Sequence, residues 1–487
     1  MTLRAQILAS SELLEDWPAE LCRRLQRRGV AAGVVTVPGE LPLQGLKLLL
    51  LLERTLFHLQ PLSAVAPPAT LDAPDIVIDL SGAAPSEVET PTLYPLFDGA
   101  PGDAAIANAL LSRRAPVVDI LCLAPGQSPR RIATATPALE HRHKFSLSYR
   151  AVAAAAAALL CASVERRARG QAFVLDEAPP PYPEALAASP AAFAATTLAQ
   201  KIAKQLTKLA VHPEHFRIGW RRVGAERAVG QTLVWPAEGY RFIEDDRKRY
   251  FTDPFVLAKG GRVFVFCEEF PYATGKGVLS AFEFFEDGAV SPPRLVLEQD
   301  HHLSYPQVFE RDGALWMIPE SSAASRIELY RAERFPDLWR LEAVLVDGVR
   351  AADATLIEHD GKLWLFATVA EDGLSDWDAL HVYVADKLCG RWRAHPGNPV
   401  LIDAASARPA GPMFKRGGEL WRPAQDCSHG YGGGLTLCRV DRLDENEFRQ
   451  TPKTRLKPPR SWRAHGAHTL HHAAGVEVID VVGWRKR

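Results

Sequence analysis

Short apolar runs separated by glycine-bearing turns recur five times in the second half of the chain. Each copy has an apolar run of strand length, a turn and a second apolar run, as residues 253–257, 260–261 and 263–268 illustrate. The five copies begin at Asp253, Tyr305, Asp353, Ala410 and Ala467. Asp-Gly and Gly-Gly turns between such runs favour β-hairpins, because these turns require positive φ angles. Recurrence every 48 to 57 residues predicts small antiparallel sheets in radial arrangement, an all-β five-bladed propeller, with a β-sandwich as the alternative.

The first part of the chain alternates between strand-like and helical spacing of its apolar residues. Strand-like runs fall at residues 3–9, 33–37, 75–80 and 116–121, and helical spacing is found over 11–28 and 146–169. Strands that alternate with helices indicate an α/β domain, and we expect a Rossmann-type sheet here.

A connection rich in proline and alanine follows over residues 177–190, where we expect an irregular linker. A helix is predicted over residues 191–211. Its apolar face consists of Leu198, Ile202, Leu206 and Leu209. The expected domains are therefore 1–170 (α/β), 171–215 (connection and linker helix) and 216–487 (propeller). Segment 235–250 is expected to supply an outer strand that closes the ring against the last blade.

Composition narrows the function classes. The 487 residues are 47% hydrophobic and carry a formal net charge of -1, which excludes an extended disordered chain and gives no general attraction to nucleic acid or anionic membranes. The seven cysteines are scattered without a Cys-x-x-Cys pair, so we expect reduced thiols and neither a disulfide framework nor a zinc site. The first residues lack a long apolar signal core, and we expect a cytoplasmic protein.

The most apolar run, residues 48–52, is far too short to span a bilayer, and so is the alanine-rich run 151–160. The helix expected over residues 46–59 is interpreted as buried in the domain. Peripheral contact with a membrane is the alternative for the same helix.

Residues 91–101, followed by a helix and the strand-like run 116–120, resemble the core of formyltransferases. Residues 96–101 are similar to the Tyr-Arg-Gly-x-x-Pro turn of that family, with one residue fewer before the proline. The family's Asn-x-His pair is missing, and Thr92 to Pro95 stand where histidine is expected. Because proton transfer to an amine needs a base of near-neutral pKa, the resemblance implies a formyltransferase-like fold without its chemistry or its folate. A generic nucleotide-binding or scaffolding α/β domain remains open.

Asp253-Pro254 at the start of a repeat is similar to the Asp-Pro that opens arabinanase- and invertase-type five-bladed propellers. Over residues 216–487 the chain more closely resembles the N-terminal propeller region of plant glucosamine inositolphosphorylceramide transferases. This resemblance rests on residues 251–255, 304–308, 319–321, 353–356 and 422–426. It implies a glycan context more firmly than catalysis, since a separate domain of the plant enzymes is thought to carry glycosyl transfer.

Equivalent positions of the inner strands converge on one end of a propeller's channel. Asp253, Tyr305 and Asp353 hold equivalent positions, and His468 lies one residue further on in its repeat. Glu268 and Glu320 end the second strand of their blades. Carboxylates that converge in a concave, partly dry site acquire separated pKa values, which acid/base work on sugars needs. We predict Asp253, Glu320 and Asp353 as catalytic residues.

The predicted substrate-binding residues are Glu268, Tyr305, Arg408, Arg422, Asp426 and His468. The carboxylate set departs from the hydrolase pattern, because the second blade opens with Tyr305 and the third ends in Ala367-Thr368. Arg408 and Arg422 are therefore expected to clamp a phosphate, which suits a nucleotide sugar or lipid-linked glycan better than a neutral polysaccharide. Structural alternatives stay open, among them an ion pair of Arg422 with Asp426 and a buried, hydrogen-bonded His468.

Aromatic residues fall into two predicted groups. The candidate platforms for sugar rings are Trp235, Tyr240, Tyr250, Tyr305, Trp377 and Tyr431. Trp316, Trp364 and Trp421 occupy equivalent positions in the repeats and are interpreted as core. Asp376 and Asp378 have the Asp-x-Asp spacing of metal-binding glycosyltransferases, but a solvated turn is the preferred interpretation, and we predict no metal site and no cofactor.

Two hypotheses of different class follow. In the first, the chain takes part in cell-surface glycan biosynthesis by transferring a glycosyl group, with Asp253 as base, Glu320 as opposing acid/base and Asp353 as the orienting group; a glycoside hydrolase is the related alternative. In the second, the propeller only binds a glycan or protein partner and the α/β domain is inert. Clustering of Asp253, Glu320 and Asp353 in one pocket would favour catalysis. The oligomeric state stays open.

Overall fold

The structure is a computed structural model that describes residues 2–39, 45–59, 69–171, 173, 175–177, 189–236, 239–244 and 246–486. The chain divides into two compact units. Unit 1 is Met1–Ala203 with Asp372–Leu374, and unit 2 is Lys204–Glu371 with Ser375–Arg487. Most of the predicted proline- and alanine-rich linker, residues 178–188, lies outside the described residues, as do the side chains of Leu206 and Leu209.

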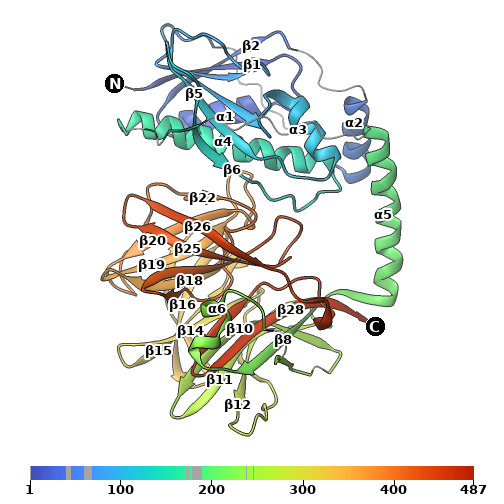
Figure 1. Ribbon diagram of the computed structural model, residues 1–487, viewed down its shortest axis with the longest axis vertical. Helices are drawn as coiled ribbons and strands as arrows, with labels where there is room; N and C mark the ends of the chain where they lie inside the picture. The colour runs from blue at the N-terminus through green and yellow to red at the C-terminus, as the bar shows by residue number, and fades with distance from the viewer. Residues whose placement is uncertain are drawn as a thin grey trace. The chain divides into compact units, whose positions relative to one another are not determined.

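Unit 1 is an α/β arrangement of helices around one sheet (Figure 1). The sheet has seven strands in the order β2-β1-β3-β4-β5-β6-β7. The strands are β1 (Arg4–Ser10), β2 (Ala31–Val37), β3 (Ile76–Leu80), β4 (Thr92–Phe97), β5 (Val118–Leu123), β6 (Arg130–Ala135) and β7 (Asp176–Glu177). The helices are α1 (Trp17–Arg27), α2 (Leu46–Phe57), α3 (Gly102–Leu111), α4 (Phe145–Ala168) and α5 (Pro190–Ala210).

The sheet is parallel only from β2 to β4, and every pair from β4 to β7 is antiparallel. The expectation of a Rossmann-type sheet is therefore wrong for the second half. A short turn joins β5 to β6, and such a turn permits antiparallel pairing alone, whereas parallel strands need a longer crossover. The resemblance to formyltransferases stays a prediction.

Helix α4 is the central helix of unit 1. Its start is held by Glu53 of α2, whose carboxylate accepts the backbone N–H groups of Phe145 and Ser146 at 2.6 and 2.8 Å. By length and apolar composition alone α4 is also long enough to cross a membrane, but 67% of its most apolar window is buried inside the protein. Burial of this kind is typical of a core helix.

Helix α2 is buried on one side only. Leu46, Leu49 and Leu50 are covered, but other leucines of the same helix are exposed to solvent. The interpretation of a buried helix therefore holds for one face only, because an apolar run of this length places leucines all round the helix while the domain covers a single face.

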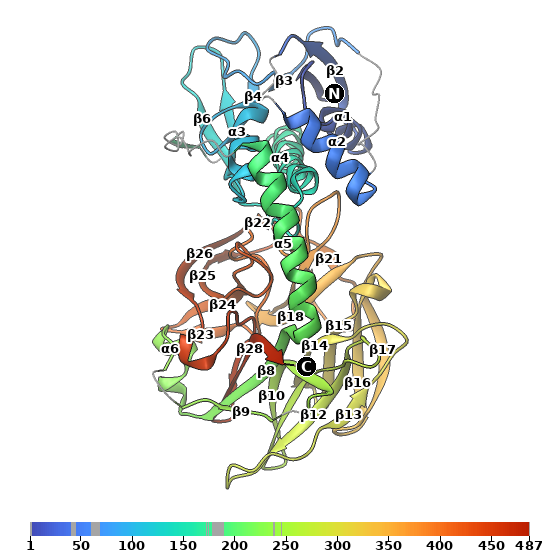
Figure 2. The same cartoon turned by 90° about the vertical axis from the view of Figure 1, so that its right-hand side faces the viewer.

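Unit 2 is a five-bladed propeller of antiparallel sheets, which confirms the predicted repeat (Figure 2). The first two blades are β10 (Arg249–Lys259), β11 (Arg262–Pro271), β12 (Val278–Phe284) and β13 (Arg294–Leu297), then β14 (Ser304–Arg311), β15 (Ala314–Glu320), β16 (Arg326–Arg334) and β17 (Leu338–Asp347). The third has β18 (Ala351–His359), β19 (Lys362–Val369), β20 (Ala379–Ala385) and β21 (Arg393–Ala394), with β22 (Leu401–Ile402) paired to β20. The fourth has β23 (Phe414–Arg416), β24 (Glu419–Gln425), β25 (Leu435–Leu443) and β26 (Phe448–Leu456). Short helices are α6 (Val229–Thr232) and the 3₁₀ turns Ala225–Arg227, Ser322–Ala324 and Arg460–Trp462.

The fifth blade closes the ring with strands from two distant parts of the chain. Its order is β27 (Leu470–Ala473), β28 (Val476–Lys486), β8 (Val211–Arg222) and β9 (Arg241–Phe242). Strand β9 lies inside the segment predicted to close the ring. Strand β8 was missed, and it moves the start of the propeller from the predicted residue 216 to Val211, because Val211 already pairs with Lys486 of β28.

Apolar side chains fill the spaces between neighbouring blades. Trp316, Trp364 and Trp421 are 9%, 2% and 3% exposed, which confirms their interpretation as core. The propeller is thus held together by packing between sheets, and its inner strands are left to line the central channel.

Candidate functional site

The inner strands of the first three blades carry β-bulges at Asp253, Tyr305 and Asp353. Their φ angles are +50°, +44° and +54°, a conformation that costs free energy for residues other than glycine. Gly411 takes this place in the fourth blade with φ +115°, and a Cβ atom there would lie 2.1 Å from the carbonyl oxygen of Leu470. The bulges interrupt the ladder and redirect the side chains of the inner strands.

Asp480 of β28 is the most fully bonded carboxylate of the channel. Its Oδ1 accepts the backbone N–H groups of His468 and Thr469 at 2.9 Å each. Its Oδ2 accepts the Thr252 hydroxyl at 2.8 Å and the Asp253 N–H at 3.0 Å. Burial works to raise the pKa of Asp480, but His468 and these hydrogen bonds outweigh it and lower the pKa. Asp480 is therefore ionised at neutral pH.

His468 lies between two carboxylates. Its Nδ1 is 2.6 Å from Asp480 Oδ2 and its Nε2 is 3.7 Å from Asp253 Oδ1. Burial would lower the pKa of His468, but Asp480 and Asp253 raise it to about 9, so the imidazole is a cation at neutral pH. We call Thr252, Asp253, His468, Thr469 and Asp480 the histidine cluster.

Asp253 differs from Asp480 in its proton affinity. It accepts the Thr469 hydroxyl at 2.9 Å and the Tyr305 N–H at 3.3 Å. Burial raises the pKa of Asp253 to about 7, with His468 acting against the rise and Asp353 adding to it. A carboxyl group of this pKa can take up or release a proton near neutral pH, which is what general acid/base chemistry requires.

Arg408 holds the second group of carboxylates. Its Nε donates to Asp353 Oδ2 at 2.7 Å and its Nη2 to Asp353 Oδ1 at 3.3 Å. Glu320 and Asp376 each have a carboxylate oxygen 3.5 Å from the same guanidinium. Gln425 donates to Asp353 Oδ2 at 2.7 Å. We call Glu320, Asp353, Asp376, Arg408 and Gln425 the arginine cluster.

The acids around the channel outnumber the cations. Burial raises the pKa of Asp353 to about 8 against the effect of Arg408, and burial also raises the pKa of Glu320. For Glu268, burial and then the neighbouring Asp253 and Glu320 raise the pKa well above its ordinary value. Like charges this close cannot all ionise, so some of these groups keep their protons at neutral pH.

The structure brings together most of the predicted site residues. Six of them belong to the two clusters or affect the pKa values of cluster residues: Asp253, Glu268, Glu320, Asp353, Arg408 and His468. The three predicted catalytic residues therefore share one environment, and their roles stay a prediction.

Two predicted substrate-binding residues, Tyr305 and Arg422, are held by internal contacts. The Tyr305 hydroxyl accepts the Gly411 N–H at 2.6 Å and is 2.9 Å from Thr355 Oγ1, so this fully buried side chain fills the channel. Arg422 is 1% exposed and donates to the carbonyl groups of Ser406 and Ala407 and to Gln450, so it is structural.

The predicted pairing of Arg422 with Asp426 is wrong, since Asp426 accepts the N–H and hydroxyl of Ser428 instead. A phosphate clamp by Arg408 and Arg422 is also wrong. Burial of Arg422 lowers its pKa, and the Arg408 guanidinium is already occupied by carboxylates.

A cavity of about 580 Å³ opens beside the two clusters. Its lining includes Glu214, Phe216, Trp377, Asp426, His429, Tyr431, Lys457 and His465. Tyr431 connects the cavity with both clusters, because its ring is 5.3 Å from the His468 ring and 5.0 Å from the Arg408 guanidinium. A pocket of this volume is large enough for a small organic ligand.

Two of the predicted aromatic platforms lie at this cavity. The rings of Trp377 and Tyr431 are 5.6 Å apart, and Tyr431 is 38% exposed. Trp235 and Tyr240 instead pack edge-on against Trp462, where they seal the fifth blade. Tyr250 stacks on Phe270, and Tyr305 is in the channel.

Sequence reasoning missed Asp480, Thr469 and Gln425. Asp480 ends the second repeat strand of its blade, as Glu268 and Glu320 do, and this equivalence was the available signal. Within the described residues, Asp253, His468 and Asp480 are the group whose ligand atoms lie close enough, within 4.8 Å, to hold a metal ion. His468 is protonated at neutral pH, so a metal ion would have to displace that proton in order to bind here.

The Asp-x-Asp pair is divided between two tasks. Asp376 belongs to the arginine cluster, whereas Asp378 is 2% exposed and accepts the Ser375 N–H at 3.3 Å. The solvated-turn interpretation is therefore wrong for Asp378, because the loop is held by its own hydrogen bonds.

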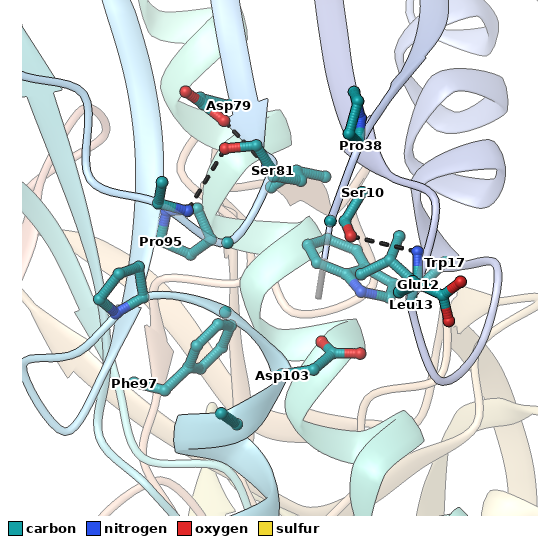
Figure 3. A pocket seen from close by; sticks show the side chains of 17 residues that line it. Ser10, Glu12, Leu13, Trp17, Pro38, Asp79, Ser81, Pro95, Phe97 and Asp103 are labelled. Atoms are coloured by element: carbon teal, nitrogen blue, oxygen red, sulfur yellow. Dashed lines mark hydrogen bonds between the residues drawn. The ribbon is translucent and has the colours of Figure 1, made fainter. Parts of the chain in front are cut away.

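Unit 1 has a separate cavity of about 450 Å³ at the carboxyl ends of β1, β3 and β4 (Figure 3). Its described lining contains Glu12, Asp79 and Asp103 but no Lys, Arg or His. Asp103 accepts the Tyr149 hydroxyl at 2.9 Å and the Leu14 N–H at 2.8 Å, and burial raises its pKa to about 6.

Comparison with known proteins concerns the propeller. The family model for glucosamine inositolphosphorylceramide transferase 1, N-terminal, matches residues 242–479. The propeller resembles the N-terminal region of these transferases. The rice (Oryza sativa subsp. japonica) transferase is 33% identical over 207 residues, 42% of this chain and 28% of that protein. The Arabidopsis thaliana transferase is 31% identical over 205 residues, 41% and 27% respectively. The chain thus spans little more than a quarter of these relatives.

Solved structures with some likeness to the chain include carbohydrate hydrolases. The RS223 β-xylosidase has a TM-score of 0.37 at 12% identity and covers 48% of this chain and 92% of its own. An exo-1,5-α-L-arabinanase from a bovine ruminal metagenomic library has a TM-score of 0.34 at 15% identity, with 50% and 95% covered. Neither likeness is close enough to transfer a site.

Proposed function

We propose that this protein acts in cell-surface glycan biosynthesis by transferring a glycosyl group from an activated sugar at the propeller channel. The observation that carries the proposal is the shared environment of Asp253, Glu320 and Asp353 beside an aromatic-walled cavity. Resemblance to the N-terminal region of glucosamine inositolphosphorylceramide transferases supports a glycan context.

The acids can divide the chemistry between them. Asp253, with a pKa of about 7, takes the proton of the acceptor hydroxyl. The acceptor oxygen meanwhile bonds to the anomeric carbon of the donor. The bond from that carbon to the phosphate oxygen breaks, and the phosphate leaves with the electron pair. Glu320, whose pKa is raised by burial, donates its proton to the leaving oxygen. Asp353 orients Arg408, whose charge sustains this arrangement.

The donor proposed is a nucleotide sugar or a lipid-linked glycan. Trp377 and Tyr431 offer apolar faces to a sugar or base ring. Since Arg408 and Arg422 are engaged elsewhere, the phosphate would face Lys457, the lysine at the rim of the cavity. A lipid-linked substrate would also bring the protein to a membrane surface.

A thermal-shift screen against nucleotide sugars, free nucleotides and polyprenyl phosphate sugars tests the proposal. Wild type is compared with Asp253→Asn and with the control Asp441→Asn, a carboxylate that pairs with Arg439 at the outer blade surface. One donor is expected to raise the melting temperature of wild type and control, because ligand bound to the folded state stabilises it. Release of the leaving nucleotide with an acceptor should fall at least about 100-fold in Asp253→Asn.

Two outcomes would contradict glycosyl transfer. Absence of a shift with every donor removes the activated-sugar substrate. Release of free sugar to water without transfer would make the protein a glycoside hydrolase.

A non-catalytic binding module is the second candidate, and one observation favours it. The carboxyl groups of Asp480 and Asp353 are engaged in several internal hydrogen bonds, as structural carboxyl groups are. In that case a glycan would raise the melting temperature of wild type and Asp253→Asn equally, with no turnover.

A further inference from the structure

Helix α2 of unit 1 presents an unpartnered apolar face. Leu48, Leu51, Leu52 and Leu56 are 60%, 61%, 45% and 63% exposed. These positions are three and four residues apart, so they lie on one side of the helix. We call these four residues the leucine face. Large contiguous apolar surfaces of this kind mark interaction sites in soluble domains.

Helix α5 passes close to α2 and adds to the exposed apolar surface (Figures 1 and 2). The Lys201 Nζ of α5 is 5.3 Å from the centre of the Phe57 ring at the end of α2. Leu198 and Ile202 of α5 are 59% and 55% exposed. Two neighbouring helices therefore expose aliphatic side chains without a partner among the described residues.

Basic residues outnumber acidic ones around the leucine face. Lys47 and Arg54 belong to α2, and Lys144 lies over the Phe57 ring at 4.8 Å. Glu53 is the acidic residue of α2, and it is 4% exposed because it holds the start of α4. The sequence of α5 contains three lysines and no acidic residue. Two acids pair with the cations of α2: Glu12 is 3.1 Å from Lys47 Nζ, and the buried Glu15 is 3.6 Å from Arg54 Nη2. Lys144 and Lys201 add positive charge beside Phe57.

We propose that the leucine face docks on the surface of an anionic lipid membrane. Leucines with a surrounding rim of lysines fit the boundary between acyl chains and negatively charged headgroups, since long lysine side chains keep their ammonium groups at the interface. A protein partner would need acidic residues placed against each of these flexible lysines, whereas a lipid surface supplies negative charge everywhere. The docking surface is independent of the proposed function, except that a lipid-linked substrate would explain why the protein meets a membrane.

Co-sedimentation of the full chain with vesicles tests the docking without any enzyme assay, so failure of the proposed function leaves the result readable. Vesicles of phosphatidylcholine alone are compared with vesicles that also contain phosphatidylglycerol. Wild type is expected to bind the anionic vesicles, and added salt should weaken that binding. Leu51→Ser/Leu56→Ser is expected to lose at least about tenfold in affinity for the anionic vesicles, because two inserted side chains are lost.

The matched control is Leu338→Ser/Leu341→Ser, which removes two leucines of the propeller that are 43% and 42% exposed. It should bind as wild type does. Unchanged melting temperatures verify that both variants fold, as expected for solvent-exposed positions. Equal vesicle binding by wild type and Leu51→Ser/Leu56→Ser would overturn the proposal, and so would equal binding to neutral and anionic vesicles. A wild-type dimer in light scattering that the same variant dissociates, without vesicle binding, would assign the face to a second copy of the chain instead.

Discussion

The histidine cluster and the arginine cluster both hold a cation among buried carboxylates, but only in the histidine cluster can the cation itself lose its charge as pH rises. Arg408 is charged at every accessible pH, and it donates hydrogen bonds to both carboxyl oxygens of Asp353. His468 owes its charge to Asp480 and Asp253 and loses it above a pKa of about 9. The cation of the arginine cluster is therefore fixed, while the imidazole of the histidine cluster can gain or lose a proton next to Asp253.

The contrast also separates two acids of the same cluster. Asp480 receives four hydrogen bonds and has a lowered pKa, whereas Asp253 receives two and has a raised pKa. Within the histidine cluster, the acid with the closer imidazole and more donors is therefore the anchor, and the acid with fewer donors is the proton carrier.

The largest expected effect is the loss of the anchor. Asp480→Ala leaves a buried imidazole and four donors without their acceptor, so we expect a loss of about 3–5 kcal/mol in the free energy of unfolding. Urea denaturation followed by tryptophan fluorescence measures it. The control Asp441→Ala breaks an exposed pair and should cost less than about 1 kcal/mol. A similarly small loss for Asp480→Ala would contradict a stabilising interaction between Asp480 and a charged His468.

A pH titration sharpens the comparison. The pKa of His468 is raised from its ordinary 6.5 to about 9, so its contribution to stability is full below 6.5 and is lost as pH rises through 9. The size of this contribution is about 3 kcal/mol. Melting temperature should therefore fall more steeply between pH 6.5 and 9 in wild type than in His468→Gln. Parallel curves for the two proteins would contradict a charged His468 in the folded state.

The smallest expected effect concerns the arginine cluster. Arg408→Lys keeps the charge but loses the two-point grip on Asp353 and the contact with Tyr431, so we expect a loss of about 1.5 kcal/mol. The pH dependence of stability should stay as in wild type. Arg439→Lys, at an exposed ion pair, is the control. A changed slope between pH 6.5 and 9 would mean that the two clusters titrate as one.

The repeat made the propeller and part of its site predictable from the sequence. Period and turn residues located all five inner hairpins, and equivalent positions in the repeats led to Asp253, Asp353, Glu320 and His468. These predictions rely on local patterning, because each blade repeats the same choice of apolar runs and glycine turns.

The errors concern interactions between segments far apart in the sequence. Gln425 meets Asp353 and Arg408 meets Glu320 only because the blades are arranged in a ring. Arg422 has the sequence context of a ligand residue, yet its partners are backbone carbonyl groups that no pattern reveals. The mixed order of the first sheet likewise depends on pairing between β4 and β5, which their apolar runs do not specify.

Closure of the ring by β8 and β28 has a consequence for how the protein is made. Strand β8 pairs with a strand that leaves the ribosome more than 250 residues later, and Asp480 lies on that late strand. During synthesis the first four blades therefore have an unpaired edge, and Asp253 lacks its contact with Asp480. Sequence-distant closure is slow to form, and it ties assembly of the acid cluster to the last step of folding. An incomplete chain would have the carboxylates but not the charge balance that tunes them.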